Sequence, residues 1–503
     1  MKNHKKMSRL HGVLCLIMLT IVLLGGSYSA SAFDAPTRAL CYNSWTNQFY
    51  WTDANDGYFR VQQGTGTQIG FWCFAEGIEV VEDAVAVGLD STNTVNTLCS
   101  GFIALNGTNW SGDPFNDDLC WASIAFSRAY QLTGNTSYNT YAENAFNQAY
   151  SRGYDPTDGG IFQSTSDTTP KATVASETCC VAGYLIYQNT GISSYLTKAK
   201  GVYAFMTNYC YIATNGMVEG AKQTPPSSWG LATSDNGMFA IASKDLGYTN
   251  NANLACDFVT NYWSISMATF TTPDTAGGPE NGIGLRGMAR IPRDPIFQQA
   301  ACNNAWSKTN MYGLVFCNWA ATTTNSYNLY CSDCMSVVAA MLCVPVISVT
   351  YATYEATNGT SGSNNVTSVV NGYVNNKAGS LSLVVNNTNM GGDPALGYVK
   401  QLVATCSIGG SLETLTIPEN GTINVMGASG SVVSALYLPV DGFNGGTNVT
   451  SVFSSLGVRN VPINNTTMGG DPAPGHAKEL KMTFSVGGNQ ETVVVLENSY
   501  LNL

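Results

Sequence analysis

The chain has 503 residues, of which 44% are apolar and only 11% are charged. Typical soluble domains carry about 25% charged residues. The missing charged residues are replaced by Asn, Thr, Ser, Gly and Tyr and not by apolar residues, which argues against a membrane protein. The length allows two or more domains. The whole chain holds only three histidines, His4, His11 and His476.

Residues 1–32 have the pattern of a secretory signal peptide. Four cations precede an apolar run over 13–24, and Ala30-Ser31-Ala32 forms an A-x-A cleavage site. A retained anchor is the alternative, but about 12 apolar residues are too few to span a bilayer. The end of the chain, 499–503, lacks the hydrophobic tail of a lipid-anchor signal. We therefore expect a secreted protein, extracellular or associated with a cell wall, with no membrane span.

Cleavage before Phe33 leaves 18 cations against 33 anions, a net charge of −15. This acidic balance argues against nucleic acid as a partner, because phosphate binding needs clustered Lys and Arg. His476 is then the one remaining histidine. Unless it folds back, histidine-based catalysis and histidine metal sites are excluded for the chain before it, so chemistry must come from carboxylates, Tyr, Lys or Cys.

Fourteen cysteines remain after cleavage, which is typical of a disulfide-bonded protein from an oxidising compartment. Cys331 and Cys334 resemble half of a zinc motif, but no second pair completes it, so a disulfide or buried thiols are favoured and no metal is expected. Cys179 and Cys180 are neighbours and are expected to have separate partners. Ten sequons predict glycosylated surface if the host glycosylates. They are Asn106, Asn109, Asn135, Asn358, Asn365, Asn386, Asn420, Asn448, Asn464 and Asn465.

The last third of the chain contains an internal repeat. The segment 386–395, with Gly-Gly-Asp-Pro at its centre, recurs at 464–473 with an offset of 78. Short alternating β-branched segments lie between the repeated markers, so we predict two tandem β-sandwich-like modules, 348–428 and 429–503. Gly-Gly-Asp-Pro is expected to form a tight turn, with a calcium or ligand role for Asp393 and Asp471 as the alternative. The modules are expected to bind a wall polymer, a matrix component or another protein.

Residues 33–347 repeat with helical periodicity instead. The segment 131–142 matches 188–199 at an offset of 57, and a weaker copy follows at 245–255. In each copy a helix ends on a glycine and a second helix begins, which predicts αα-hairpins. Further apolar helical stretches lie near 72–87, 174–187, 233–245, 283–290 and 332–346. About six hairpins favour an all-α (α/α)6 barrel, and an open solenoid is the alternative.

Asp117 and Asp118 stand together at the start of the clearest helix. A structural interpretation is available, because Asn and Asp are favoured helix caps and acids suit a first turn. The chemical interpretation is that one carboxylate stays ionised as a nucleophile while the other keeps its proton. Glycoside hydrolysis requires this division of labour.

Five segments carry a resemblance to a known family: Asn116–Trp121, Arg128–Gly134, Asp158–Phe162, Lys171–Glu177 and Asn281–Arg290. Together they resemble the Asp-Asp signature and later motifs of glycoside hydrolase family 76, which comprises α-1,6-mannanases and related fungal wall proteins. The resemblance covers most of residues 40–347. It implies an (α/α)6 barrel and a retaining reaction without any cofactor.

The resemblance assigns Asp117 as the nucleophile and Asp118 as the general acid/base. It places Gly159, Gly160 and Phe162 in the strip beside the sugar. The family's tryptophan pair is here Phe162-Gln163, and its later asparagines are Ala172 and Ser176. These departures fall on positions that shape sugar subsites.

Aromatic side chains are candidates for stacking on a sugar ring. Trp110, in the loop ahead of the Asp pair, is the first candidate, and Trp72, Trp121, Trp229 and Trp319 are others; core packing is the alternative for each. Arg286 or Arg290 is expected either to orient a site carboxylate or to form a surface ion pair.

Three functions compete. The first is a secreted hydrolase or transglycosidase acting on α-1,6-linked mannan or a related glycan. The second is a non-catalytic glycan-binding or matrix protein that has kept the barrel as a scaffold. The third is an enzyme on the same barrel with another polysaccharide as its substrate.

Overall fold

The computed structural model describes residues 33–53, 55–166, 171–222, 231–263, 278–291, 293–376, 379–409, 411–426, 431–456, 461–486, 489–498 and 500–501. The predicted signal peptide, 1–32, and Trp229 lie outside the described residues. Within the described part of the chain, no helix is both long enough and apolar enough to cross a bilayer.

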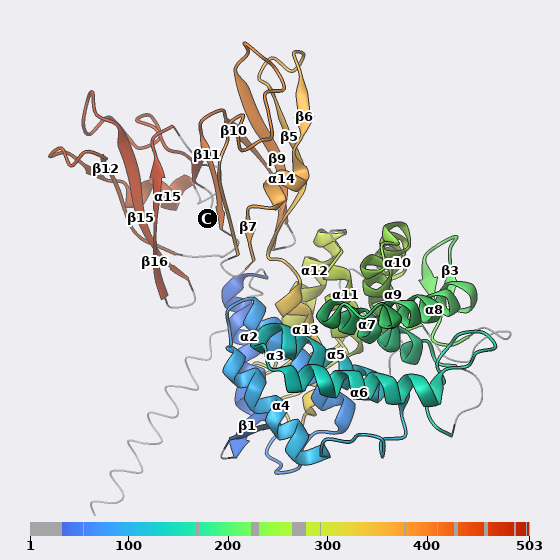
Figure 1. Cartoon of the computed structure of the whole chain (residues 1–503). Coiled ribbons are helices and arrows are strands. Elements are labelled where there is room, and N and C mark those ends of the chain that lie inside the picture. Colours follow the sequence, from blue (N-terminus) through green and yellow to red (C-terminus); the bar gives the residue numbers. More distant parts are fainter. Residues whose placement is uncertain are drawn as a thin grey trace, which may run out of the picture. The chain divides into compact units, whose positions relative to one another are not determined.

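The described residues between 33 and 346 form twelve helices (Figure 1), so the predicted all-helical character of this part is confirmed. The helices are α2 (Ala35–Phe49), α3 (Phe71–Ala86), α4 (Thr92–Asn106), α5 (Asn116–Thr133), α6 (Thr136–Gly153), α7 (Thr173–Thr190), α8 (Ser193–Tyr209), α9 (Thr233–Asp245), α10 (Thr249–Trp263), α11 (Glu280–Ala289), α12 (Pro295–Trp306) and α13 (Cys331–Cys343). Two small hairpins interrupt them: β1 (Tyr50–Asp53) with β2 (Asp56–Phe59), and β3 (Tyr211–Ile212) with β4 (Met217–Val218).

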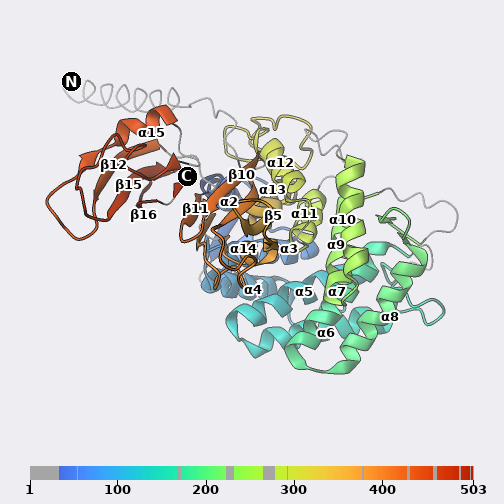
Figure 2. The same cartoon turned by 90° about the horizontal axis from the view of Figure 1, so that it is seen from above.

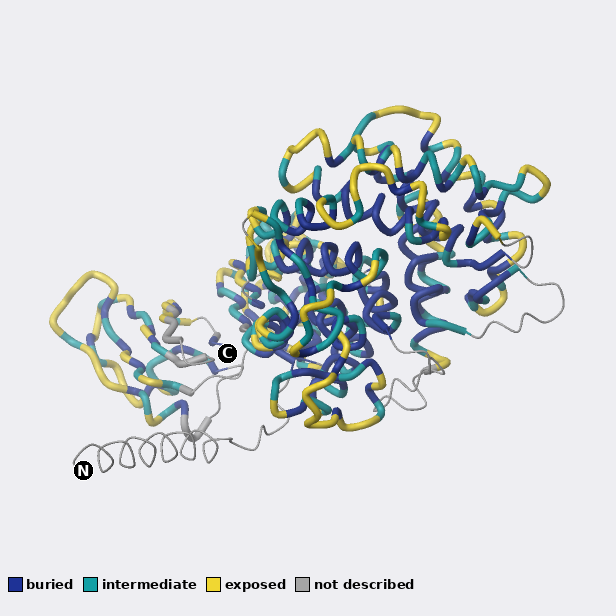
Figure 3. Tube along the Cα trace, turned by 90° about the horizontal axis from the view of Figure 1, so that it is seen from below, coloured by how far each residue is buried: buried dark blue, intermediate teal, exposed yellow. Residues whose placement is uncertain are grey.

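Alternate helices contact one another in series. Helix α3 packs against α5, α5 against α7, α7 against α9, α9 against α11, α11 against α13, and α13 against α3. Helices α4, α6, α8 and α10 each pack against the helix that precedes them, and α2 and α12 contact α13 (Figure 2). Buried residues run through the interior of this helical part (Figure 3).

Helices α5 and α7 both end on a left-handed glycine, as the 57-residue spacing predicts. Gly134 has φ 73° and donates its N–H to the Tyr130 carbonyl at 2.8 Å. Gly191 has φ 71° and donates to the Tyr187 carbonyl at 2.8 Å. Residues with a side chain are strained in this conformation, so glycine ends the helix at low cost. Helices α6 and α8 begin two residues later, and these hairpins are therefore confirmed.

Glycines of α11 bring its backbone against two neighbouring helices. A Cβ on Gly287 would lie 2.3 Å from the carbonyl oxygen of Gly237 in α9. A Cβ on Gly282 would lie 2.1 Å from the carbonyl oxygen of Ser336 in α13. Any side chain at these positions would force the helices apart, which explains why glycine recurs along this helix.

The cysteines do not follow the prediction, because no disulfide joins any pair that the structure describes. Cys73 and Cys343 are half-buried, and the other twelve cysteines of the described chain are buried. They lie mostly within the helices, where a cysteine packs as a small apolar residue. The composition indicated an oxidising compartment, but it did not distinguish bonded cysteines from core thiols.

From Ile347 onward, strands occupy most of the described chain. The first strand-rich segment, 347–426, has one sheet in the order β10-β9-β5-β6 and another in the order β11-β8-β7. The second, 431–501, has sheets in the orders β13-β12-β15-β16 and β14-β17. In the first segment the bounds are β5 (Ile347–Ala356), β6 (Ser363–Asn365), α14 (Thr367–Asn371), β7 (Val374–Asn375), β8 (Ser380–Val384), β9 (Lys400–Ile408), β10 (Ser411–Pro418) and β11 (Thr422–Met426). In the second they are β12 (Ser431–Pro439), β13 (Thr447–Asn448), α15 (Thr450–Leu456), β14 (Val461–Pro462), β15 (Lys478–Val486), β16 (Asn489–Leu496) and β17 (Tyr500–Leu501).

The Gly-Gly-Asp-Pro sequence forms a turn in both segments. Gly391 and Gly392 have φ 79° and 138°, and the corresponding glycines of the second copy have φ 83° and 142°. The Asp393 side chain accepts the backbone N–H of Ala395 at 2.9 Å, which closes the turn. The expectation of a tight turn that needs positive φ is therefore confirmed at both positions.

A nearly buried lysine contacts the acid of this turn in each copy. Lys400 Nζ lies 3.4 Å from Asp393 Oδ1 and 3.3 Å from Glu419 Oε2. In the second segment Lys478 Nζ lies 3.1 Å from Asp471 Oδ1 and 3.4 Å from the equivalent glutamate. The ammonium group occupies the place beside these carboxylates that a bound cation would take. This arrangement favours the structural interpretation of the two aspartates over a calcium site.

Candidate active site

The Asp pair lies in the first turn of α5, and neither aspartate caps the helix. The N-cap residue is Phe115, which makes no side-chain cap hydrogen bond. The Asn116 side chain donates to the Phe162 carbonyl at 2.7 Å, so it does not cap the helix either. Asp117 is 7% exposed and Asp118 is half-buried. Two carboxyl groups are thus removed from water without the N-cap bond that would make their position purely structural.

An extended strip, residues 161–165, runs beside the start of α5. The backbone N–H of Asn116 donates to the Gln163 carbonyl at 2.6 Å, and the N–H of Thr165 donates to the Pro114 carbonyl at 2.9 Å. The Gln163 side chain then reaches one residue further, where its Nε2 donates to Asp117 Oδ2 at 3.1 Å. The other oxygen of that carboxyl, Oδ1, is buried without a hydrogen-bond partner.

Arg152, in the last turn of α6, holds the loop ahead of the pair from another side. Its Nε donates to Asn116 Oδ1 at 2.6 Å. Its Nη atoms donate to the backbone carbonyls of Ser111 at 3.1 Å, Asp113 at 2.7 Å and Phe115 at 3.2 Å. A single guanidinium therefore fixes the loop that leads into the Asp pair.

The environment separates the two carboxyl groups electrostatically. Burial raises the pKa of Asp117 to about 6, while the Gln163 hydrogen bond and nearby backbone N–H groups oppose this rise. Burial also raises the pKa of Asp118, to about 8, and the negative charges of Asp117 and Asp113 add to the effect. Near neutral pH Asp117 is therefore mainly ionised and Asp118 mainly protonated. Two interacting groups of this kind titrate as a pair.

The strip beside the pair is anchored by buried contacts. Gly160 lies against Phe205, whose ring would stand 2.7 Å from a Cβ at that position. The ammonium group of Lys171 pairs with Asp158 and lies 4.8 Å from the centre of the Phe162 ring. Gly159 has φ 87°, a conformation that favours glycine. Of the predicted residues, Phe162 is brought to the start of α5 by the hydrogen bond from Asn116, whereas Gly159 and Gly160 lie against α8.

Three of the predicted tryptophans, Trp110, Trp121 and Trp319, pack in the interior instead, whereas Trp72, in the first turn of α3, is half-buried. Trp110 is 4% exposed, and its indole N–H donates to the Gly107 carbonyl at 2.9 Å. Its ring lies 5.9 Å from Phe71, 5.2 Å from Phe102 and 5.1 Å from Phe126. Trp121 is also 4% exposed, and Trp319 is fully buried. Their placement is that of core residues, the alternative that the sequence left open, because the surrounding helices cover their rings.

Further carboxyl groups, which the sequence analysis missed, stand at the starts of other helices in the same series. They are Glu177 in α7, Asp235 in α9, Glu280 in α11 and Asp333 in α13. Burial, then the charges of Asp235 and Glu280, raise the pKa of Glu177 well above its ordinary value. Burial and the charges of Asp118, Glu76, Glu280 and Asp333 do the same to the Cys73 thiol at the start of α3. The starts of these helices therefore face a common region, and a count of acids at helix starts would have found them.

Arg286 is neither a partner of the Asp pair nor part of a surface ion pair. It is 2% exposed and contacts Glu76 Oε1 at 2.7 Å and Asp83 Oδ2 at 2.7 Å. Arg128 in α5 contacts Glu79 Oε2 at 2.8 Å in the same cluster. These ion pairs join α3, α5 and α11 in the interior of the helical part, which gives Arg286 a structural role.

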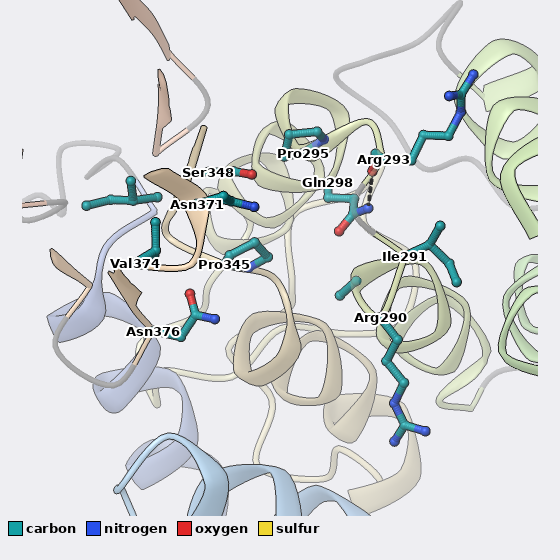
Figure 4. Close-up of a pocket in the computed structure, with 12 residues that line it drawn as sticks. Arg290, Ile291, Arg293, Pro295, Gln298, Pro345, Ser348, Asn371, Val374 and Asn376 are labelled. Atoms are coloured by element: carbon teal, nitrogen blue, oxygen red, sulfur yellow. Dashed lines mark hydrogen bonds between the residues drawn. The ribbon is translucent and has the colours of Figure 1, made fainter. Parts of the chain in front are cut away.

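A pocket of about 160 Å³ lies away from the Asp pair, and Figure 4 shows its lining residues. It is formed by the end of α11, the start of α12, and the chain around β5, α14 and β7. Gln298, on its wall, donates to the Arg293 carbonyl at 2.8 Å. Its lining includes neither Asp117 nor Asp118, so this hollow and the candidate active site are distinct.

Comparison with known proteins gives two findings. The sequence model of Glycosyl hydrolase family 76 matches residues 97–225. Among solved structures, the α-1,6-mannanase GH76A from Salegentibacter sp. HEL1_6 is similar with a TM-score of 0.52 and 21% identity, covering 62% of this chain and 98% of that chain. An inactive variant of that enzyme is in complex with α-1,6-mannotetrose. No curated protein matches the sequence.

Two further solved structures agree in extent. The Lin0763 protein from Listeria innocua has a TM-score of 0.53 and 16% identity, covering 62% of this chain and 97% of that chain. A family 76 glycoside hydrolase from a bovine Bacteroides thetaiotaomicron strain has a TM-score of 0.51 and 12% identity, covering 61% of this chain and 76% of that chain. The 61% to 62% of this chain that these structures cover corresponds in size to the helical part. This part therefore shares the all-helical, barrel-like fold of these structures.

Proposed function

We propose that this chain is a glycoside hydrolase that cleaves α-1,6-linked mannan or a related glycan by a retaining mechanism with Asp117 and Asp118. The observation that carries the proposal is this adjacent pair of buried carboxyls, whose pKa values the surroundings push apart. The pair lies inside the segment that matches the family 76 model. The solved mannanase of similar fold, with its α-1,6-mannotetrose complex, supports the substrate class.

Asp117 is the proposed nucleophile. Its Oδ2 accepts from Gln163, which holds the carboxylate in the first turn of α5. In the first step a carboxylate oxygen of Asp117 bonds to the anomeric carbon while the glycosidic C–O bond breaks, which forms a glycosyl ester on Asp117. The ionised state that this step needs is favoured near neutral pH, because the pKa of Asp117 is about 6.

Asp118 is the proposed general acid/base. Its raised pKa keeps a proton on the carboxyl at neutral pH, and this proton passes to the departing glycosidic oxygen. In the second step the Asp118 carboxylate takes a proton from water, the water oxygen attacks the anomeric carbon, and Asp117 leaves as a carboxylate. A sugar hydroxyl in place of water would make the reaction a transglycosylation. No step requires a cofactor.

The proposal extends to the architecture around the site. We propose that the helical part, 33–347, is a closed (α/α)6 barrel, which the serial contacts of α3 through α13 and back to α3 support. We propose a signal peptide at 1–32 and two tandem modules at 348–428 and 429–503 that bind a wall polymer, matrix or protein. Two shared features support the modules. The larger sheet has the same strand order in both, β10-β9-β5-β6 in the first and β16-β15-β12-β13 in the second. In each, a buried lysine contacts a glutamate, Lys400 with Glu419 and Lys478 with Glu497.

The decisive experiment measures release of reducing ends from α-1,6-mannan by the full chain. Asp117→Asn and Asp118→Asn are each expected to lose at least about 100-fold in kcat/KM while remaining folded. Asp53→Asn, an exposed carboxylate on β1, is the matched control and is expected to keep full activity. Full activity in both Asp-pair variants would reject the catalytic assignment. Proton NMR would report the configuration at the anomeric carbon of the product, and inversion there would reject the retaining mechanism.

The non-catalytic alternative has one specific observation in its favour. The predicted stacking residues Trp110 and Trp121 are both buried, so their rings are not open to a sugar. Binding of mannan without any product after prolonged incubation would support this alternative. A panel of other polysaccharides in the same assay would identify an enzyme with a different substrate.

A further inference from the structure

The contact between Gln163 and the Asp pair depends on both the backbone and the side chain of Gln163. Its carbonyl accepts the N–H of Asn116 at 2.6 Å, which sets the register of the strip against the start of α5. From that fixed point the side-chain amide donates to Asp117 Oδ2 at 3.1 Å. The Asn116 side chain adds a second bond to the strip, at the Phe162 carbonyl. These contacts of the strip with the start of α5 therefore fix the position from which the amide reaches Asp117.

We infer that Gln163 is a positioning residue that holds the Asp117 carboxylate through Oδ2 and favours its ionised form for attack. The inference rests on the proposed function and deepens it. A glutamine amide offers two N–H donors and can therefore hold an ionised carboxylate, which only accepts hydrogen bonds.

The other groups around Asp117 do not supply such a donor from across the site. Asp118 and Cys120 lie on the same helix as Asp117, and Asp113 precedes that helix. None of these three side chains favours a negative charge on Asp117. Arg152, from α6, donates to Asn116 and to backbone carbonyls. Among the described residues, the amide of Gln163 is the side-chain group that donates a hydrogen bond to the Asp117 carboxylate.

The test compares Gln163→Met with the wild-type chain and with Thr165→Val, an exposed position on the same strip. Methionine has a similar length but no donor, so the inference predicts that kcat falls about 10-fold or more while KM changes little. Loss of a bond to the ionised form raises the pKa of Asp117, so the acid limb of kcat/KM moves to higher pH by at least about 0.5 unit. The alkaline limb and the Thr165→Val profile should not move.

A second measurement separates this inference from the proposed function. Titration of ¹³C-labelled aspartate carboxyls by NMR, with Asp117→Asn to assign the signal, reports the ionisation of Asp117 without any substrate. A higher titration midpoint in Gln163→Met supports the positioning role, even if the wild-type chain hydrolyses no glycan and the proposed function fails. An unchanged midpoint together with an unchanged acid limb overturns the inference, and Gln163→Asn, which keeps a donor on a shorter side chain, should recover part of the effect.

Discussion

Asp118 should make the folded chain less stable as the pH rises, and Asp118→Asn should remove that loss. Burial, then the charges of Asp117 and Asp113, raise the pKa of Asp118 from 3.8 to about 8. A folded-state pKa above the unfolded value means that the stabilising contribution is complete below about pH 4 and is lost as the pH rises through 8. The neutral amide of asparagine has no such dependence.

The size of the effect follows from the same values. At 1.36 kcal/mol per pKa unit, ionising Asp118 in the folded chain at pH 8 costs at most about 5 kcal/mol. The side chain is half-buried and keeps some contact with solvent, so we expect about 2 kcal/mol. For a domain of this size, that difference corresponds to a rise in Tm of roughly 3 to 6 °C at pH 8.

Thermal unfolding followed by circular dichroism at 222 nm, from pH 4 to pH 8, provides the assay. The Tm difference between Asp118→Asn and wild type should be near zero at pH 4 and should grow steadily above pH 5. Asp53→Asn, which changes an exposed carboxylate on β1, should give a flat difference. A difference that does not depend on pH, or a variant less stable than wild type at pH 8, would refute the electrostatic description of the site.

Three further predictions concern other features of the chain. If the proposed reaction holds, kcat/KM should be bell-shaped with limbs near pH 6 and pH 8, because one carboxyl must be ionised and its neighbour protonated; a profile flat from pH 5 to 9 would contradict this. Gly287→Ala should lower the unfolding free energy by about 2 kcal/mol or more in urea titrations, since the new Cβ would stand 2.3 Å from a carbonyl oxygen of α9. Gly112→Ala is the control and should have little effect, because the space around Gly112 is open. Lys400→Met should destabilise the first strand-rich segment by about 1 to 3 kcal/mol, because it removes the cation that Asp393 and Glu419 share; hydrogen exchange would localise the loss.

Local backbone chemistry was predictable from the sequence because it depends on a few adjacent residues. The left-handed ends of α5 and α7 at Gly134 and Gly191 follow from glycine at the end of an apolar period. The Gly-Gly-Asp-Pro turns follow from the same freedom of glycine at positive φ. The position of the Asp pair in the first turn of a helix likewise follows from the apolar stripe that begins after Asp118.

Contacts between distant segments were not predictable, because they depend on which helices meet. Trp110 was placed in a loop ahead of the site, yet four helices contribute aromatic rings that enclose it. The hydrogen bond from Gln163 to Asp117 joins positions 46 residues apart. Cysteine number indicated disulfides, but pairing depends on geometry that a single sequence does not contain.

The burial of the Asp pair is the strongest argument that its role is not only to suit the helix dipole. A favourable interaction with a helix N-terminus is worth about 0.3 to 1 kcal/mol for an exposed acid, and it is available without burial. Here Asp117 is 7% exposed and leaves Oδ1 without a partner, and ionisation of Asp118 is opposed by burial and by two neighbouring charges. These costs exceed what the dipole returns. An arrangement that lowers stability at a helix start, in a chain with few charged residues, fits the proposed reaction, which needs two differently protonated carboxyls.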